Sequence, residues 1–207
     1  MFREHAYGRD DFVNGLNDAK RLVYNHYKTD KESSIVHNNL KDMKDVLTYS
    51  LQYQKGAWVL HMLRNYVGED NFRKGIRNYY KKYYNSTTTT NQFKTEMEVV
   101  SGMNLDTFFD QWLYKGGNMV LDGNWKFDEK KGRIEVNLNQ VQNDGYLFEM
   151  PVELGISYND KNLEKIQTVK LEKEKGRFYI ASDSKPISIK IDPNTKLLAI
   201  WDFNEIK

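Results

Sequence analysis

The sequence contains no cysteine, so it can form neither disulfide bonds nor thiolate metal sites. It has no apolar run of transmembrane length, and its first residues lack the basic and apolar regions of a secretion signal. We therefore expect a soluble chain without a membrane segment. Its charges nearly cancel, with 31 Lys and Arg against 29 Asp and Glu, and the two signs are interspersed. This balance argues against a nucleic-acid partner.

The sequence also lacks the motifs of several common active sites. It has no Gly-rich phosphate loop and no G-x-S-x-G nucleophile elbow. Four histidines are present: His5, His26, His37 and His61. None belongs to an H-E-x-x-H pair, in which two imidazoles one helical turn apart bind zinc. We therefore name no metal ligand and no cofactor-binding residue, and expect His61 in a core or at its rim and the other three on the surface.

The composition is nevertheless that of a folded protein. Hydrophobic residues make up 39% of the chain and aromatic residues 14%, which is enough apolar material for packed cores. A length of 207 residues allows one or two compact units.

The first half of the sequence has the apolar period of helices. Phe12, Leu16, Ala19 and Val23 recur at steps of three and four residues, which predicts an amphipathic helix behind an acidic first turn. A polar loop is expected over residues 28–39. Further helices are expected from about residue 52 to Gly68 and over residues 72–83, 93–100 and 105–113.

The predicted helix that begins near residue 52 is unusually apolar. Tyr53, Ala57 and Leu60 are spaced to share one face with Val67, and other apolar residues widen that face. The breadth of the face predicts a largely buried helix.

After Gly117 the apolar period changes to two. Apolar and polar residues alternate over residues 134–138, 152–156, 169–171, 178–180 and 187–191, with turn residues between these segments. Short strands joined by hairpin turns, with no helical pattern between them, predict an antiparallel sandwich of about seven strands. The expected fold class is therefore α+β, with an all-helical segment over residues 1–116 followed by a C-terminal antiparallel β-sandwich over residues 117–207.

Three ordered motifs in the helical half carry a family resemblance. The segment Y-Q-K-G-A-W-V-L-H-M-L-R begins at Tyr53. The segment G-E-D-N-F-R-K-G-I-R-N-Y begins at Gly68, and S-G-M-N-L-D-T-F-F-D-Q-W begins at Ser101. In this order they resemble the Y-x-K-G, G-x-x-x-F and F-F-x-q-W motifs of the aminopeptidase N family, the gluzincin metallopeptidases. Lys55-Gly56 and the F-F-x-x-W spacing are not demanded by helical periodicity.

The resemblance implies that this chain is a truncated fragment of a zinc aminopeptidase, a hydrolase that removes N-terminal residues from peptides. Residues 1–116 would be the C-terminal part of its thermolysin-like catalytic domain, followed by the β-sandwich domain. Tyr7-Gly8 and the helix after them look like the segment that follows the family's third zinc ligand. The zinc ligands would then lie in missing upstream domains, and this chain alone would be inactive and bind no zinc.

One site residue carries over by the resemblance. Tyr53 matches the family tyrosine whose hydroxyl donates a hydrogen bond to the oxyanion formed from the peptide carbonyl, which makes it the one candidate catalytic residue. Lys55 and Gly56 are interpreted structurally, with Lys55 capping or snorkelling and Gly56 permitting close helix approach. His37 falls where the family has a loop near the active-site cleft, although a plain surface loop is the favoured interpretation.

Two alternatives remain from the residues themselves. The chain could be a non-catalytic interaction module, in which the sandwich binds a protein partner and the helices are scaffold. A carbohydrate-binding sandwich has only Trp125 and Trp201 in its favour, and isolated tryptophans in strands usually belong to a core. An H-E-x-x-H encoded upstream would favour the enzyme.

Overall fold

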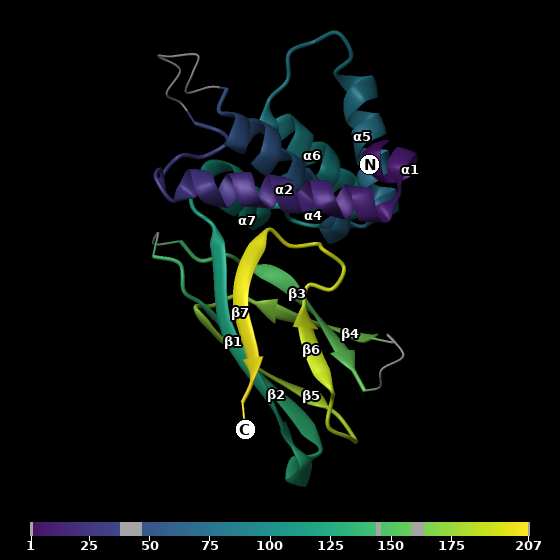
Figure 1. The fold of residues 1–207 in the computed structure, drawn as a ribbon. Coiled ribbons are helices and arrows are strands. Elements are labelled where there is room, and N and C mark those ends of the chain that lie inside the picture. Colours follow the sequence, from purple (N-terminus) through teal and green to yellow (C-terminus); the bar gives the residue numbers. More distant parts are fainter. Residues whose placement is uncertain (1, 38–46, 144–145, 159–163, 207) are drawn as a thin grey trace. The chain divides into compact units, whose positions relative to one another are not determined.

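The computed structural model describes residues 2–37, 47–143, 146–158 and 164–206. The chain divides into two compact units, Met1–Gly116 and Gly117–Lys207. The first is helical and the second is built of strands (Figure 1), which confirms the α+β class. None of the helices within the described ranges has both the length and the apolar character needed to cross a bilayer.

The helical unit contains six α-helices and two π-helical segments among its described residues. In chain order these are α1 (Phe2–Tyr7), α2 (Arg9–Tyr27), η1 (Tyr49–Lys55), α4 (Gly56–Val67), α5 (Glu69–Lys82), α6 (Thr90–Ser101), α7 (Asp106–Phe109) and η2 (Asp110–Tyr114). The predicted stripe of α2 is correct, because all four of its apolar residues are buried. Its spacing allows only one apolar face, so periodicity alone fixes the buried side.

Turn chemistry explains where several of these helices begin and end. Gly68 separates α4 from α5 and has a φ of 87°, a backbone conformation that residues other than glycine rarely adopt. Thr89 caps α6 through a capping box, in which its side chain accepts from the Gln92 amide while the Gln92 side chain accepts from the Thr89 amide. This pair of hydrogen bonds fixes the start of α6.

The predicted buried face of α4 is correct in part. Val67 is buried as predicted, but Tyr53, Ala57 and Leu60 are exposed. The buried residues of the helix are Trp58, Val59, His61, Met62, Leu63 and Val67. Apolar residues surround this helix on nearly every side, so their spacing could not select the side that packs. Trp58 is fully buried and its indole Nε1 donates to the Leu16 carbonyl of α2 at 2.8 Å.

The second unit contains two sheets. The strands are β1 (Met119–Asp128), β2 (Arg133–Gln140), β3 (Met150–Ser157), β4 (Glu164–Leu171), β5 (Lys175–Ala181), β6 (Ser188–Ile191) and β7 (Ala199–Glu205), with a short 3-10 turn η3 (Glu129–Lys131) between the first two. One sheet has the order β5-β2-β1-β7 and the other β4-β3-β6 (Figure 1). Alternate residues of β2 are buried and form part of the core of this unit.

One strand pair departs from the predicted antiparallel arrangement. Strands β1 and β7 are parallel, with Met119 opposite Ala199 and Trp125 opposite Glu205. The strands between them in the sequence supply the long connection that a parallel pair needs. Trp125 is buried in this sheet at 3% exposure, which removes it as a surface platform for a carbohydrate.

Candidate functional site

Tyr53 lies in η1, immediately before α4, and its side chain is 59% exposed. The Gly56 amide bonds to the Leu51 carbonyl five residues earlier, which is the hydrogen-bond pattern of a π-helix. Such π-helical turns within α-helices frequently occur at functional sites. The neighbouring ring of Tyr49 is 5.9 Å from that of Tyr53 between centroids.

Tyr53 borders a groove of about 560 Å³, called the Tyr53 groove below. Its described lining residues are Ile35, Val36, Gln52, Tyr53, Gly56, Ala57, Val59, Leu60, Leu63, Tyr79, Thr88, Thr89, Thr90, Phe93, Phe109 and Leu113. None of these side chains carries a charge. The sequence did not reveal the groove, although the spacing of Tyr53, Ala57 and Leu60 was a signal that we assigned to a buried face.

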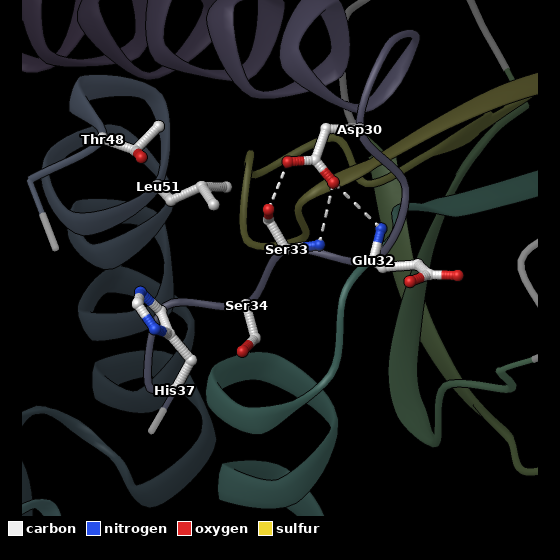
Figure 2. A pocket seen from close by; sticks show the side chains of 7 residues that line it. All are labelled: Asp30, Glu32, Ser33, Ser34, His37, Thr48 and Leu51. Atoms are coloured by element: carbon white, nitrogen blue, oxygen red, sulfur yellow. Dashed lines mark hydrogen bonds between the residues drawn. The ribbon is translucent and has the colours of Figure 1, made fainter. Parts of the chain in front are cut away.

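A second cavity, of about 530 Å³, lies beside the start of η1 and has a different lining (Figure 2). It contains His37, Thr48 and Leu51 together with the polar turn around Asp30. The Asp30 carboxylate accepts from the Ser33 hydroxyl and from the amides of Ser33 at 3.1 Å and Glu32 at 3.3 Å. The bond from the Ser33 hydroxyl is the main cause that lowers the Asp30 pKa.

Asp30 thus holds its own loop together. The His37 imidazole lines this cavity (Figure 2), and His37 is not among the described lining residues of the Tyr53 groove. Residues 38 and 39, the last two of the predicted loop, lie outside the described residues.

The described histidines do not gather into a metal site. Over the ranges that the structure covers, no group of three His, Cys, Asp or Glu side chains could hold a metal ion. His61 is buried at 7% exposure between the rings of Phe12 and Trp58, as expected for a core histidine. His5 is exposed as predicted, whereas His26 is only partly exposed, with 18% of its side chain accessible and its Nε2 3.8 Å from the Asp30 carboxylate. The described side chains therefore form no cluster that fits a zinc ion.

Lys55 has a structural position. It is fully buried, so the expected snorkelling is wrong, but its Nζ donates to the Lys115 carbonyl at 3.3 Å just after η2. The same ammonium donates to the Tyr27 hydroxyl at 2.8 Å, and Tyr27 donates to the Ser33 carbonyl. A Cβ at Gly56 would meet nothing closer than the Leu51 carbonyl at 3.7 Å, so close helix approach does not require this glycine. Through its two hydrogen bonds, Lys55 connects η1 to the end of α2 and to the residue that follows η2.

A chain of alternating charges connects α1, α4 and α5. Glu4 accepts from Arg9 at 2.9 Å and from Arg64 at 2.8 Å. Arg64 also pairs with Glu69, which pairs in turn with Arg73. The hydrogen bond from Arg64 is the main cause that lowers the Glu4 pKa, and Arg9 adds to it. A helix of six residues such as α1 is too short to be stable alone, so these bonds fix its position.

We expect Glu4→Gln to lower the free energy of unfolding at pH 7 by about 1 kcal/mol. The pKa of Glu4 is lower in the folded state, so its stabilisation is present above the unfolded pKa of about 4.3 and is lost as the pH falls through the folded value. The difference between the two proteins should therefore shrink at acid pH. Urea unfolding of both chains at pH 7 and at pH 3 measures it.

The control is Glu32→Gln, since Glu32 is exposed and makes no ion pair in the described part of the chain. It should change the unfolding free energy little at either pH. An equal loss for Glu4→Gln at pH 7 and pH 3 would contradict the assignment of this stabilisation to the carboxylate charge.

Comparisons with known proteins relate the helical unit to a family of peptidases. Residues 4–112 match the model of the peptidase family M1 domain. Probable aminopeptidase 2 of Sulfurisphaera tokodaii is 31% identical over 142 residues, which are 69% of this chain and 17% of that protein. Aminopeptidase N of Lactococcus lactis is 26% identical over 104 residues, or 50% of this chain and 12% of that protein. The chain thus spans about a sixth or less of the length of these relatives.

The fold has a solved counterpart. A crystal structure of Legionella pneumophila aminopeptidase A in complex with aspartic acid matches 98% of this chain and 22% of its own, with a TM-score of 0.75 and 16% identity. At this identity the match concerns the fold alone. The family match covers more than half of the chain and contains all three motifs, so this chain belongs to the peptidase family M1.

Proposed function

We propose that this chain is part of a zinc aminopeptidase that hydrolyses N-terminal peptide bonds. Residues 1–116 supply the C-terminal helical part of the catalytic domain, including Tyr53, and residues 117–207 are the β-sandwich domain that follows it. The match of residues 4–112 to peptidase family M1 carries this proposal. The aminopeptidase names of the relatives support the reaction class, and a peptide is the substrate.

In this proposal Tyr53 acts on the developing oxyanion. Its phenol hydroxyl is a hydrogen-bond donor on an exposed side chain, at the border of a groove that can take part of a substrate. A donor aimed at the oxygen that becomes negative stabilises the transition state more than the bound peptide. Tyr53 lies in the π-helical turn, and the buried Lys55 of the same turn holds it in place by a hydrogen bond to the Lys115 carbonyl.

The zinc of the parent enzyme is assigned to residues outside this chain, because the described residues do not fit a metal site. This part of the enzyme would accordingly be inactive alone. The competing function is a non-catalytic interaction module, and the activity of the longer protein distinguishes the two.

We expect the isolated chain, after dialysis against a chelator, to retain far less than one zinc per molecule and to hydrolyse no amino-acid anilide. The longer protein that contains this chain should hold about one zinc and cleave the same substrate. Elemental analysis and a chromogenic assay measure both properties. One tightly held zinc in the isolated chain would contradict the assignment of the ligands, and an inactive, zinc-loaded longer protein would favour the interaction module.

A further inference from the structure

We propose that the outward side of α5 binds an extended, acidic segment of a partner polypeptide. This surface consists of Lys74, Arg77 and Lys81 together with the rings of Tyr80 and Tyr84, and it is called the α5 surface below. The inference goes beyond the proposed function and does not depend on it, because it involves neither the Tyr53 groove nor the reaction.

The sequence around α5 has a one-sided charge distribution. No Asp or Glu occurs between Asp70 and Glu96, whereas this stretch contains six Lys and Arg residues. Three of these cations form ion pairs with acids outside the stretch, namely Arg73 with Glu69, Lys82 with Glu96 and Lys94 with Asp106. The other three are exposed and have no ion pair within the described part of the chain: Lys74, Arg77 and Lys81. Their charge is therefore available to a partner.

Packing against α6 fixes which side of α5 faces outward. Gly75 is buried, and a Cβ at this position would lie 2.6 Å from the Met97 Sδ of α6. So close a contact leaves α5 little freedom to rotate. Lys74, Arg77 and Lys81 follow one another at steps of three and four residues, on the side of the helix away from this contact. They form one row that is about 10 Å long at a rise of about 1.5 Å per residue.

Two exposed tyrosines lie beside this row. Tyr80 is 65% exposed and Tyr84 is 63% exposed, and their ring centroids are 5.5 Å apart. Tyrosine and arginine are enriched in protein interfaces relative to the rest of a protein surface. The two rings add contact area to a surface that would otherwise attract a partner by charge alone.

The chemistry of the α5 surface favours an acidic polypeptide over other anionic partners. Alternate side chains of an extended chain recur on one side about every 6.5 to 7 Å, so two or three carboxylates of one segment can reach the three cations. A bilayer fits less well, because the exposed residues of α5 include no aliphatic side chain that could enter the acyl region. A nucleic acid also fits less well, since the rings of Tyr80 and Tyr84 are inclined by 61° and offer no common platform for stacked bases.

The test measures the binding of a labelled peptide to the longer protein that contains this chain. The probe is a fluorescent peptide in which Glu alternates with Ser, and its N-terminus is acetylated so that an aminopeptidase cannot degrade it. We expect saturable binding by fluorescence anisotropy, and the combined change Lys74→Glu, Arg77→Glu and Lys81→Glu should weaken it about tenfold or more. Raising the salt from about 50 mM to about 300 mM should also weaken binding to the unmodified protein, because exposed charges are screened.

The matched control reverses three exposed charges of the second unit, by Lys130→Glu, Lys173→Glu and Lys175→Glu. It alters the net charge by the same amount and should change the affinity by less than about twofold. A further variant, Tyr80→Ser with Tyr84→Ser, keeps every charge and should weaken binding about threefold. Circular dichroism and thermal melting check that each variant folds. If the charge-reversed α5 variant does not fold, replacement of the same three residues by Gln carries the test, with an expected loss of about threefold.

Binding that is weakened in the α5 variant and retained in the control supports the inference. Equal binding by these two variants overturns it, as does the absence of binding to the unmodified longer protein. Single-stranded DNA with the same number of charges and anionic phospholipid vesicles are measured in parallel. Tighter binding of either one than of the peptide would overturn the choice of an acidic polypeptide as the partner.

Discussion

Replacing Tyr53 by Phe should lower kcat of the longer enzyme by roughly a hundredfold to a thousandfold, the usual effect of removing one oxyanion donor. The hydroxyl is needed only when negative charge develops, so KM and zinc content should change little. Phe keeps the ring, and the Tyr53 side chain is 59% exposed, so stability should also be preserved. Steady-state kinetics on an amino-acid anilide, with elemental analysis of each preparation, measures these effects.

Tyr49→Phe is the matched control. Tyr49 lies in the same π-helical segment, is 60% exposed, and has its ring 5.9 Å from that of Tyr53. Loss of this hydroxyl should leave kcat nearly unchanged. If the two variants lose activity equally, or if Tyr53→Phe remains fully active while folded and zinc-loaded, Tyr53 is a surface aromatic residue without a catalytic role.

The largest effect on stability is expected at Trp58. Trp58→Ala should reduce the free energy of unfolding of the helical unit by about 3 to 5 kcal/mol, because it leaves a large cavity and removes the donor to the Leu16 carbonyl. Trp58→Phe keeps most of the volume and loses mainly the hydrogen bond, so its cost should be about 1 to 3 kcal/mol. Urea unfolding of the chain, monitored by far-UV circular dichroism rather than by tryptophan fluorescence, measures both.

Tyr80→Ala supplies the comparison, since Tyr80 is a large aromatic residue of α5 that is 65% exposed. Its truncation should cost less than about 0.5 kcal/mol. A Trp58→Ala variant no less stable than Tyr80→Ala would show that α2 and α4 do not depend on this contact.

The sequence predicted those parts of the fold in which the apolar residues allow only one buried face. The stripe from Phe12 to Val23 has one apolar side, and the alternation of Ile134, Val136 and Leu138 has one buried face. The parallel pairing of β1 with β7 could not be predicted, because it joins segments at opposite ends of the second unit. No local pattern encodes such a pairing.

The resemblance names Tyr53 as the catalytic candidate, and this role stays a prediction. The periodicity placed its side chain on a buried face, whereas it is exposed. The groove beside it could not be predicted, since Val36, Phe93 and Leu113 come together only in the folded chain. Its uncharged lining is a property of that assembly rather than of any one segment.

The π-helical turn of η1 determines the angle around the helix axis between the side chain of Tyr53 and that of the buried Trp58. An α-helix turns by about 100° per residue, so losing a single residue between these two positions would swing the phenol roughly a quarter of a turn around the helix. The same rotation would turn the buried side chains of Leu51 and Lys55 out of the core and break the hydrogen bonds of Lys55 to Tyr27 and Lys115. A one-residue deletion at this point should therefore cost both the direction of the phenol and the stability of the helical unit, whereas a substitution at an exposed position nearby changes neither.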